Sequence, residues 1–162
     1  MPIREPGLGA APPRSRSNSA DLAPRAPRRS RLAVLAAVLE GFLAVGALGG
    51  GLALMIGPQG QIISLPVSDL AGSPFDSYFV PGLILFTVLG LGPLLVVGLA
   101  WRGHRSAPLL TVAAAAGLLI WIAIEIAVVG YSGSPPLQAF YIALGLVLGL
   151  VGLVWMGHRE YS

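Results

Sequence analysis

Cysteine is absent from this chain of 162 residues, and charged side chains are scarce. Without cysteine, disulfide bonds, thiolate metal sites and thiol–disulfide relays are excluded. Charged residues make up 10% of the sequence, whereas about 25% is usual in soluble proteins. The shortage of charge therefore argues against an ordinary soluble domain.

Apolar residues take the place of the missing charge. They make up 55% of the chain, and the mean hydropathy is +0.80, which is typical of a membrane protein. The formal net charge of +3 does not indicate nucleic-acid binding, because all ten basic residues are arginines beside apolar runs, with no aromatic residues between them. We therefore expect a lipid bilayer as the partner, and no nucleic acid.

Residues 1–31 hold six of the 14 prolines and seven of the ten arginines. Such a segment buries too little apolar surface to offset the entropy of ordering it, so it predicts a disordered cytoplasmic tail. Its end, RRSRL, is similar to a twin-arginine export signal. However, Arg31 stands where that signal has an apolar residue, and Glu40 interrupts the run that follows, so we expect an uncleaved first span.

Four later runs are apolar and long enough to cross a bilayer, which takes about 20 residues in a helix. They cover residues 32–56, 79–101, 109–131 and 137–156. All ten arginines lie in the tail, in the loop between the second and third runs, or after the fourth run, so the positive-inside rule predicts that both termini are cytoplasmic. The sequence thus predicts an all-α membrane protein. Its fold would be an antiparallel four-transmembrane-helix bundle over residues 32–157, with a short cytoplasmic C-terminus at 158–162.

Prolines and aromatic residues mark the irregular points and the ends of the runs. The long outer loop is expected to hold a short helix over residues 66–72, and Asp76 or Ser77 is a candidate cap for the second span. Pro93 inside that span predicts a kink and leaves the Leu89 carbonyl without its usual partner. An interfacial aromatic belt is predicted at Tyr78, Trp101, Tyr131 and Tyr161.

Small residues spaced by three and four indicate the contact faces of membrane helices. In the first run this face contains Glu40, which is therefore expected to face protein rather than lipid. The fourth run has a GxxxG pattern from Gly145 to Gly149. The predicted faces are Ala33, Ala37, Glu40, Ala44, Ala47 and Gly51 in the first run, Ala114, Gly117, Trp121, Glu125 and Val128 in the third, and Tyr141, Gly145, Gly149 and Gly152 in the fourth.

Glu40 and Glu125 are the two acids inside the spans, where a charge costs about 3 kcal/mol or more, and both are expected to be buried. At about 1.5 Å of rise per residue, Glu40 lies about 12 Å beyond Leu32, and Glu125 about 24 Å beyond Leu109. Both helices run outward, so Glu40 is in the inner half and Glu125 in the outer half. This separation argues against a dyad that shares one proton. Two separate sites, two ends of one polar path, or two neutral structural groups stay open.

The acids define two candidate sites. The first, a candidate proton or ligand site, contains Glu40, Trp155 and Pro93. A protonated Glu40 would donate to the Leu89 carbonyl freed by Pro93, or meet the indole of Trp155, which is an alternative to a place for Trp155 in the aromatic belt. The second, a candidate outer polar cluster held by hydrogen bonds, consists of Glu125, Trp121, Gln138 and Tyr141.

Other chemistry has little support in the sequence. His104 and His158 fall at helix ends, where interfacial histidines are commoner than haem ligands. The chain has no metal-ligand spacing, nucleophile elbow or phosphate loop. We therefore expect no catalytic residues, no metal, no cofactor and no enzymatic activity.

Three segments of the chain carry a resemblance to other proteins. LEGFLAVGALGGGLAL, LAGSPFDSYFVPGLIL and SPPLQAFYIALG resemble a widespread group of small uncharacterised bacterial four-span integral membrane proteins. The similarity covers residues 32–155, and residues 73–83 are its most distinctive part. It implies a four-helix bundle in the bacterial cytoplasmic (inner) membrane and supplies no activity. The helix count is also similar to that of DoxX-like proteins, with no matching motif.

Two functions follow from these patterns. The first is a non-enzymatic multi-pass membrane protein that acts as an accessory or partner-binding subunit or forms homo-oligomers. The alternative is a proton-coupled exporter of small solutes or drugs, since a Glu in the first of four spans and a Trp in the third is similar to small multidrug-resistance transporters. That resemblance implies roles for Glu40 and Trp121, but the long outer loop, Pro93, the second acid and the arginine-rich tail depart from it.

Overall fold

The computed structural model describes residues 30–131 and 136–160, without the side chains of 159 and 160. The predicted tail lies outside the described residues, apart from Ser30 and Arg31. Within the described parts the chain forms helices and turns and no strand. The elements are α1 (Arg31–Ile56), η2 (Val67–Leu70), α2 (Phe79–Ile84), η3 (Leu85–Leu91), α3 (Gly92–Trp101), α4 (Ala107–Val129) and α5 (Leu137–Glu160).

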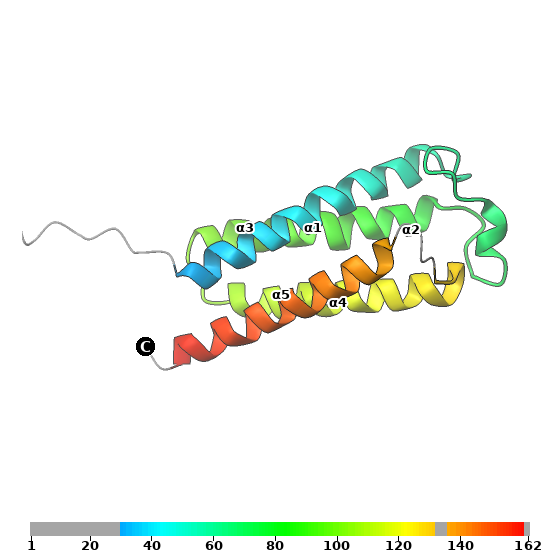
Figure 1. The fold of residues 1–162 in the computed structure, drawn as a ribbon. Coiled ribbons are helices and arrows are strands. Elements are labelled where there is room, and N and C mark those ends of the chain that lie inside the picture. Colours follow the sequence, from blue (N-terminus) through cyan, green and yellow to red (C-terminus); the bar gives the residue numbers. More distant parts are fainter. Residues whose placement is uncertain (1–29, 132–135, 161–162) are drawn as a thin grey trace, which may run out of the picture.

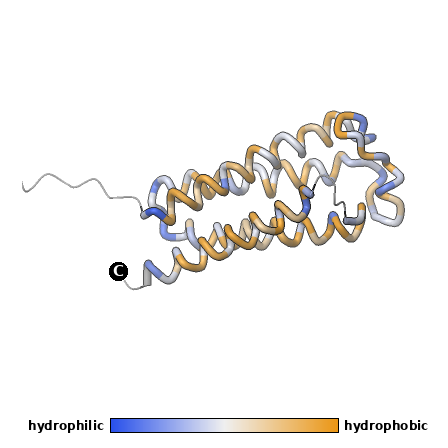
Figure 2. Tube along the Cα trace, viewed as in Figure 1, coloured by the Kyte–Doolittle hydropathy of each residue, from blue (hydrophilic) through white to orange (hydrophobic). Residues whose placement is uncertain are grey.

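These elements form four rods that alternate in direction, because α2, η3 and α3 follow one another without a break (Figure 1). Each rod is long and apolar enough to cross a membrane, and polar residues gather at the two ends of the bundle (Figure 2). The antiparallel four-helix membrane fold is thus confirmed. The third span, α4, is displaced from the predicted run by two residues at each end, since it begins at Ala107 and ends at Val129.

The first helix begins where its sequence provides a cap. The Ser30 hydroxyl accepts a hydrogen bond from the Ala33 amide at 3.1 Å, as a serine at this position is expected to do. The six residues of the predicted contact face are all buried: Ala33, Ala37, Glu40, Ala44, Ala47 and Gly51. Small residues therefore do bring this face of α1 into the bundle.

Gly51 and Gly82 set the contact between α1 and α2. A Cβ atom added to Gly51 would lie 2.7 Å from the Gly82 carbonyl oxygen, and one added to Gly82 would lie 2.7 Å from Cβ of Leu54. Neither position has room for a side chain. The two backbones touch here because both residues lack one.

The second rod stays helical through Pro93 and widens just before it. Residues Leu85–Leu91 form a π-helical segment, in which the Gly92 amide bonds to the Thr87 carbonyl. Proline removes one N–H from the ladder and crowds the carbonyl four residues earlier, and a π-turn is one way to accommodate this. The sequence predicted a kink at this place, and the structure has a π-helical segment there.

The third span, α4, buries a stripe of residues that the sequence did not predict, beside the predicted contact face. The fully buried residues of α4 are Ala107, Pro108, Thr111, Ala115, Leu118 and Ile122. The predicted face, which ran from Ala114 to Val128, lies beside this stripe and is partly exposed. Its small residues and its acid suggested a core face, but larger apolar side chains fill the centre.

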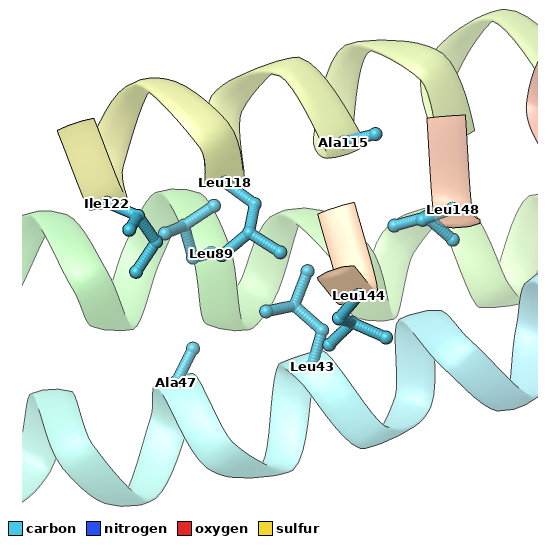
Figure 3. Close-up of a cluster of buried hydrophobic side chains, with 8 residues drawn as sticks. All are labelled: Leu43, Ala47, Leu89, Ala115, Leu118, Ile122, Leu144 and Leu148. Carbon is cyan, nitrogen blue, oxygen red and sulfur yellow. The ribbon is translucent and has the colours of Figure 1, made fainter. Parts of the chain in front are cut away.

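The fourth helix packs on α4 through the predicted glycines. A Cβ on Gly145 would lie 2.8 Å from Leu119, and one on Gly152 would lie 2.7 Å from Val112. The central core, which comprises eight side chains, fills the space between the rods (Figure 3). Its members are Leu43, Ala47, Leu89, Ala115, Leu118, Ile122, Leu144 and Leu148.

The loop between α1 and α2, residues 57–78, folds back over one end of the bundle. It forms a small cap that is anchored by Tyr78. This side chain is 3% exposed, and its hydroxyl donates to the Pro66 carbonyl at 3.0 Å. Its amide donates to the Pro58 carbonyl at 2.8 Å. The predicted short helix is the four-residue 3₁₀ turn η2, and its Leu70 packs with Leu54 and Tyr78.

Two predictions about this region were wrong. Tyr78 is not an interfacial belt residue, because the cap buries it. It is also the N-cap residue of α2, with no side-chain hydrogen bond at that end, so neither Asp76 nor Ser77 caps the helix. Trp101 and Tyr131 are 56% and 61% exposed near rod ends, as an aromatic belt requires, and Tyr161 lies outside the described residues.

Candidate buried acid sites

Glu40 is the most deeply buried ionisable side chain among the described residues. Its side chain is 0% exposed, and neither carboxyl oxygen has a hydrogen-bond partner. Its neighbours one turn away on α1 include Ala36, Ala37 and Ala44, which are buried as well. Burial of an unpaired carboxyl is costly, so this residue is the least satisfied polar group inside the bundle.

Thr111 of α4 is the group that lies beside the Glu40 carboxyl. Its hydroxyl faces the carboxyl across the bundle, but the contact falls short of hydrogen-bond geometry, since the hydroxyl is also unpartnered. Thr111 is 0% exposed, and its methyl group lies near Gly152 of α5. We name Glu40 and Thr111 the central polar pair.

Apolar residues close the central polar pair off on both sides. Toward the outer end lies the central core. Toward the inner end lies a second cluster that contains Trp155 at 2% exposure. Its buried members are Ala33, Ala36, Ala100, Ala107, Val151 and Trp155. The pair thus lies between two hydrophobic layers.

The partners predicted for Glu40 are wrong. Neither the Leu89 carbonyl nor the Trp155 indole bonds to it, because both carboxyl oxygens lack a partner. The helix register explains why the Leu89 carbonyl does not reach Glu40. Leu48 packs against Gly90, so Leu89 lies level with a residue about two turns beyond Glu40. Pro93 is fully buried, but the carbonyl that it affects, that of Leu89, lies too far along the bundle from Glu40.

Thr111 was not among the residues predicted for the site. It is the one hydroxyl-bearing residue in α4, and a spacing of four places it on the same stripe as Ala107 and Ala115. That signal was available in the sequence. Its position opposite Glu40 depends on how α1 and α4 are shifted along each other, which one sequence does not specify.

The structure separates the two acids as predicted. Thr111 marks the level of Glu40 on α4, and Glu125 lies 14 residues further along the same helix, which is about 21 Å. No paired-carboxylate chemistry is available at that distance. Glu125 is also only partly buried, whereas the sequence predicted that both acids are buried.

Of the four residues predicted for the outer polar cluster, Gln138 and Glu125 are joined by a hydrogen bond. Gln138 Nε2 donates to Glu125 Oε1 at 3.1 Å and to the Gly130 carbonyl at 3.0 Å. Gln138 therefore ties the start of α5 to the end of α4. Tyr141 and Trp121 both pack against the central core, and the Tyr141 hydroxyl lies against Gly46 of α1.

The pair taken from the transporter resemblance does not meet. Trp121 lies ten residues outward of Thr111 on α4, about 15 Å from the level of Glu40. Glu40 is enclosed within one bundle rather than open to a chamber. The geometry therefore does not favour a joint role for Glu40 and Trp121.

Both histidines contact backbone groups of their own segments. His104 Nδ1 accepts from the Ser106 amide at 3.2 Å, and His158 Nδ1 lies 2.8 Å from the Val154 carbonyl oxygen. Within the part of the chain that the structure describes, no three His, Cys, Asp or Glu side chains gather as metal ligands.

No family model, curated protein or solved structure matches this chain. The site is therefore interpreted from its own geometry.

Proposed function

We propose that this multi-pass membrane protein acts without catalysis, as an accessory subunit that binds another transmembrane helix. The outward face of α4 carries this proposal. α4 is the least buried of the four spans. Five of its exposed residues repeat at spacings of three and four, beside the exposed Leu109 and Ile124. We name these five the alanine face: Ala113, Ala116, Ile120, Ala123 and Ala127.

Small residues let the backbones of two membrane helices approach closely, so an alanine-lined face is suited to a helix and a bulky face to lipid. The other rods present larger side chains outward. Val38 and Val45 of α1 are 62% and 71% exposed, and Leu150 and Leu153 of α5 are 62% and 57% exposed. The contrast supports α4 as the partner-binding helix.

Site-directed crosslinking tests the proposal, because the chain has no native cysteine. Ala116→Cys on the alanine face and Val45→Cys on α1 would be compared in native membranes with a thiol-reactive crosslinker. We expect an adduct of one defined mass from Ala116→Cys and none from Val45→Cys. The added Ala123→Leu change should reduce its yield. Equal adducts at both cysteines, or none at Ala116→Cys, would overturn the proposal.

The location and orientation belong to the same proposal. The described arginines Arg31, Arg102 and Arg105 are exposed at one end of the bundle, and Asp69 and Asp76 lie in the cap at the other end. The positive-inside rule then supports a bacterial cytoplasmic membrane with both termini in the cytoplasm.

A further inference from the structure

The central polar pair combines complete burial with unmet hydrogen bonding. Three oxygen atoms, two from Glu40 and one from Thr111, are buried without a partner. Native proteins pair nearly all such atoms, so each exception needs an explanation. Helices α1 and α4 touch at few positions, while each packs extensively against α3 or α5. The pair therefore lies at the centre of the bundle, where these two helices meet across it.

No charged side chain among the described residues lies level with Glu40. On α1, Arg31 is exposed nine residues away, and α2, η3 and α3 have no ionisable residue. On α4, Glu125 lies 14 residues beyond Thr111. On α5, the Tyr141 hydroxyl lies at Gly46, and His158 is exposed beyond Trp155. An ionised Glu40 would thus have no counter-charge.

The chemistry of the pair selects the ligand. A neutral carboxyl has one O–H donor, and the Thr111 hydroxyl has lone pairs that accept it. A buried carboxylate without a cation costs several kcal/mol. A hard metal cation needs about six oxygen ligands, and the side chains of the pair offer three oxygens. A proton is the ligand that leaves the fewest groups unsatisfied.

We propose that Glu40 and Thr111 form a buried proton-binding site at the centre of the bundle. The proton comes from water and resides on the Glu40 carboxyl, which donates to Thr111 Oγ1 after a small closure of α1 toward α4. This bond joins α1 to α4 across the bundle, independently of any partner on the alanine face.

Infrared spectroscopy of the full chain in lipid vesicles tests the site. At pH 7 we expect the C=O stretching band of a protonated carboxylic acid. Glu40→Gln should remove this band, and the matched control Glu125→Gln should keep it. Absence of the band from the unsubstituted protein, or its persistence in Glu40→Gln, would overturn the proposal.

Two further arms test the partner and the ligand. In Thr111→Val the band should shift to higher frequency, because the carboxyl loses its acceptor, and an unchanged position would refute the pairing. Addition of Na⁺ at constant pH should leave the band intact. Loss of the band on Na⁺ addition would mean that a metal cation displaces the proton, which also overturns the proposal.

Discussion

Glu40 occupies a position that an apolar residue would fill at lower cost. Its carboxyl is enclosed by small residues and makes no hydrogen bond, so its presence opposes stability. Replacement of buried polar groups by apolar groups of similar size is often neutral or stabilising. The residue is therefore better explained by a role than by packing.

This cost can be measured by substitution at one position. Glu40→Gln should change the free energy of unfolding by less than about 1 kcal/mol, because an amide keeps the size and hydrogen-bonding capacity of the acid. Glu40→Met should be neutral or stabilising by about 1 kcal/mol. Reversible unfolding in mixed micelles measures both, and a loss of several kcal/mol in either variant would show that the acid holds the fold together.

The burial of Glu40 could be predicted, but its partner could not. Alanines at spacings of three and four on both sides of Glu40 show which face is buried, and that information is local to one helix. Thr111 becomes a partner only through the relative shift of α1 and α4, which depends on side chains from all four rods. The Gln138–Glu125 bond was easier to predict, because a short connection places the two residues at similar depth.

Tyr78 gives the outer cap a pH dependence. Burial raises the pKa of the Tyr78 hydroxyl above its ordinary value of 10.0, and the nearby negative charge of Asp69 raises this pKa further. A phenol whose pKa is higher in the folded state stabilises the cap fully below about pH 10. This contribution is lost as the pH rises from the unfolded pKa through the folded one.

We therefore expect the cap to open in alkali when Tyr78 ionises. The tyrosinate absorbance that Tyr78→Phe removes should develop only above the ordinary pKa of 10.0, and Asp69→Asn should lower the pKa of Tyr78. Tyr78→Phe should cost about 1 kcal/mol, since it removes the hydrogen bond to Pro66. If Asp69→Asn left the titration of Tyr78 unchanged, the charge of Asp69 would not be a cause of the shift.

At the scale of the element, close contact between α1 and α2 depends on two glycines. Gly51→Ala would push a methyl group to within 2.7 Å of the Gly82 carbonyl oxygen, and overpacking of this kind costs about 1–3 kcal/mol. Gly49→Ala is the matched control, because nothing lies within 4 Å of its added Cβ and alanine favours helix. Unfolding measurements should show a loss for Gly51→Ala and none for Gly49→Ala. Equal effects of the two substitutions would mean that helix propensity, rather than the contact with Gly82, determines the change in stability.

Among the elements, the spans could be predicted from the sequence, but the buried face of α4 could not. Spans were predictable, because about 20 apolar residues in a row have few other uses. The buried face of α4 was not, since alanines line its outward side while Leu118 and Ile122 fill the core. Small residues mark a contact face, but they do not say whether the contact lies within one bundle or with a partner.

Along the bundle, the described polar groups lie at several levels: the arginines at one end, the central polar pair, and the Gln138–Glu125 pair and the cap toward the other end. The central polar pair is closed off from both ends by apolar layers, so the described side chains form no polar path along the bundle. We expect vesicles containing this protein to show no uptake of cationic dyes driven by a pH gradient, and Glu40→Gln to give the same result. Uptake that Glu40→Gln abolishes would establish the exporter alternative instead.

Orientation is a property of the whole molecule, because the start of α1, the α3–α4 turn and the end of α5 lie at one end (Figure 1). If the arginines set the topology, Ser68→Cys in the outer cap should react with a membrane-impermeant thiol reagent in intact cells. Ser17→Cys and Ser106→Cys should react only after permeabilisation. Since the chain has no native cysteine, each signal reports one position. Labelling of Ser106→Cys in intact cells would invert the proposed topology and place the cap, with Tyr78 and Asp69, in the cytoplasm.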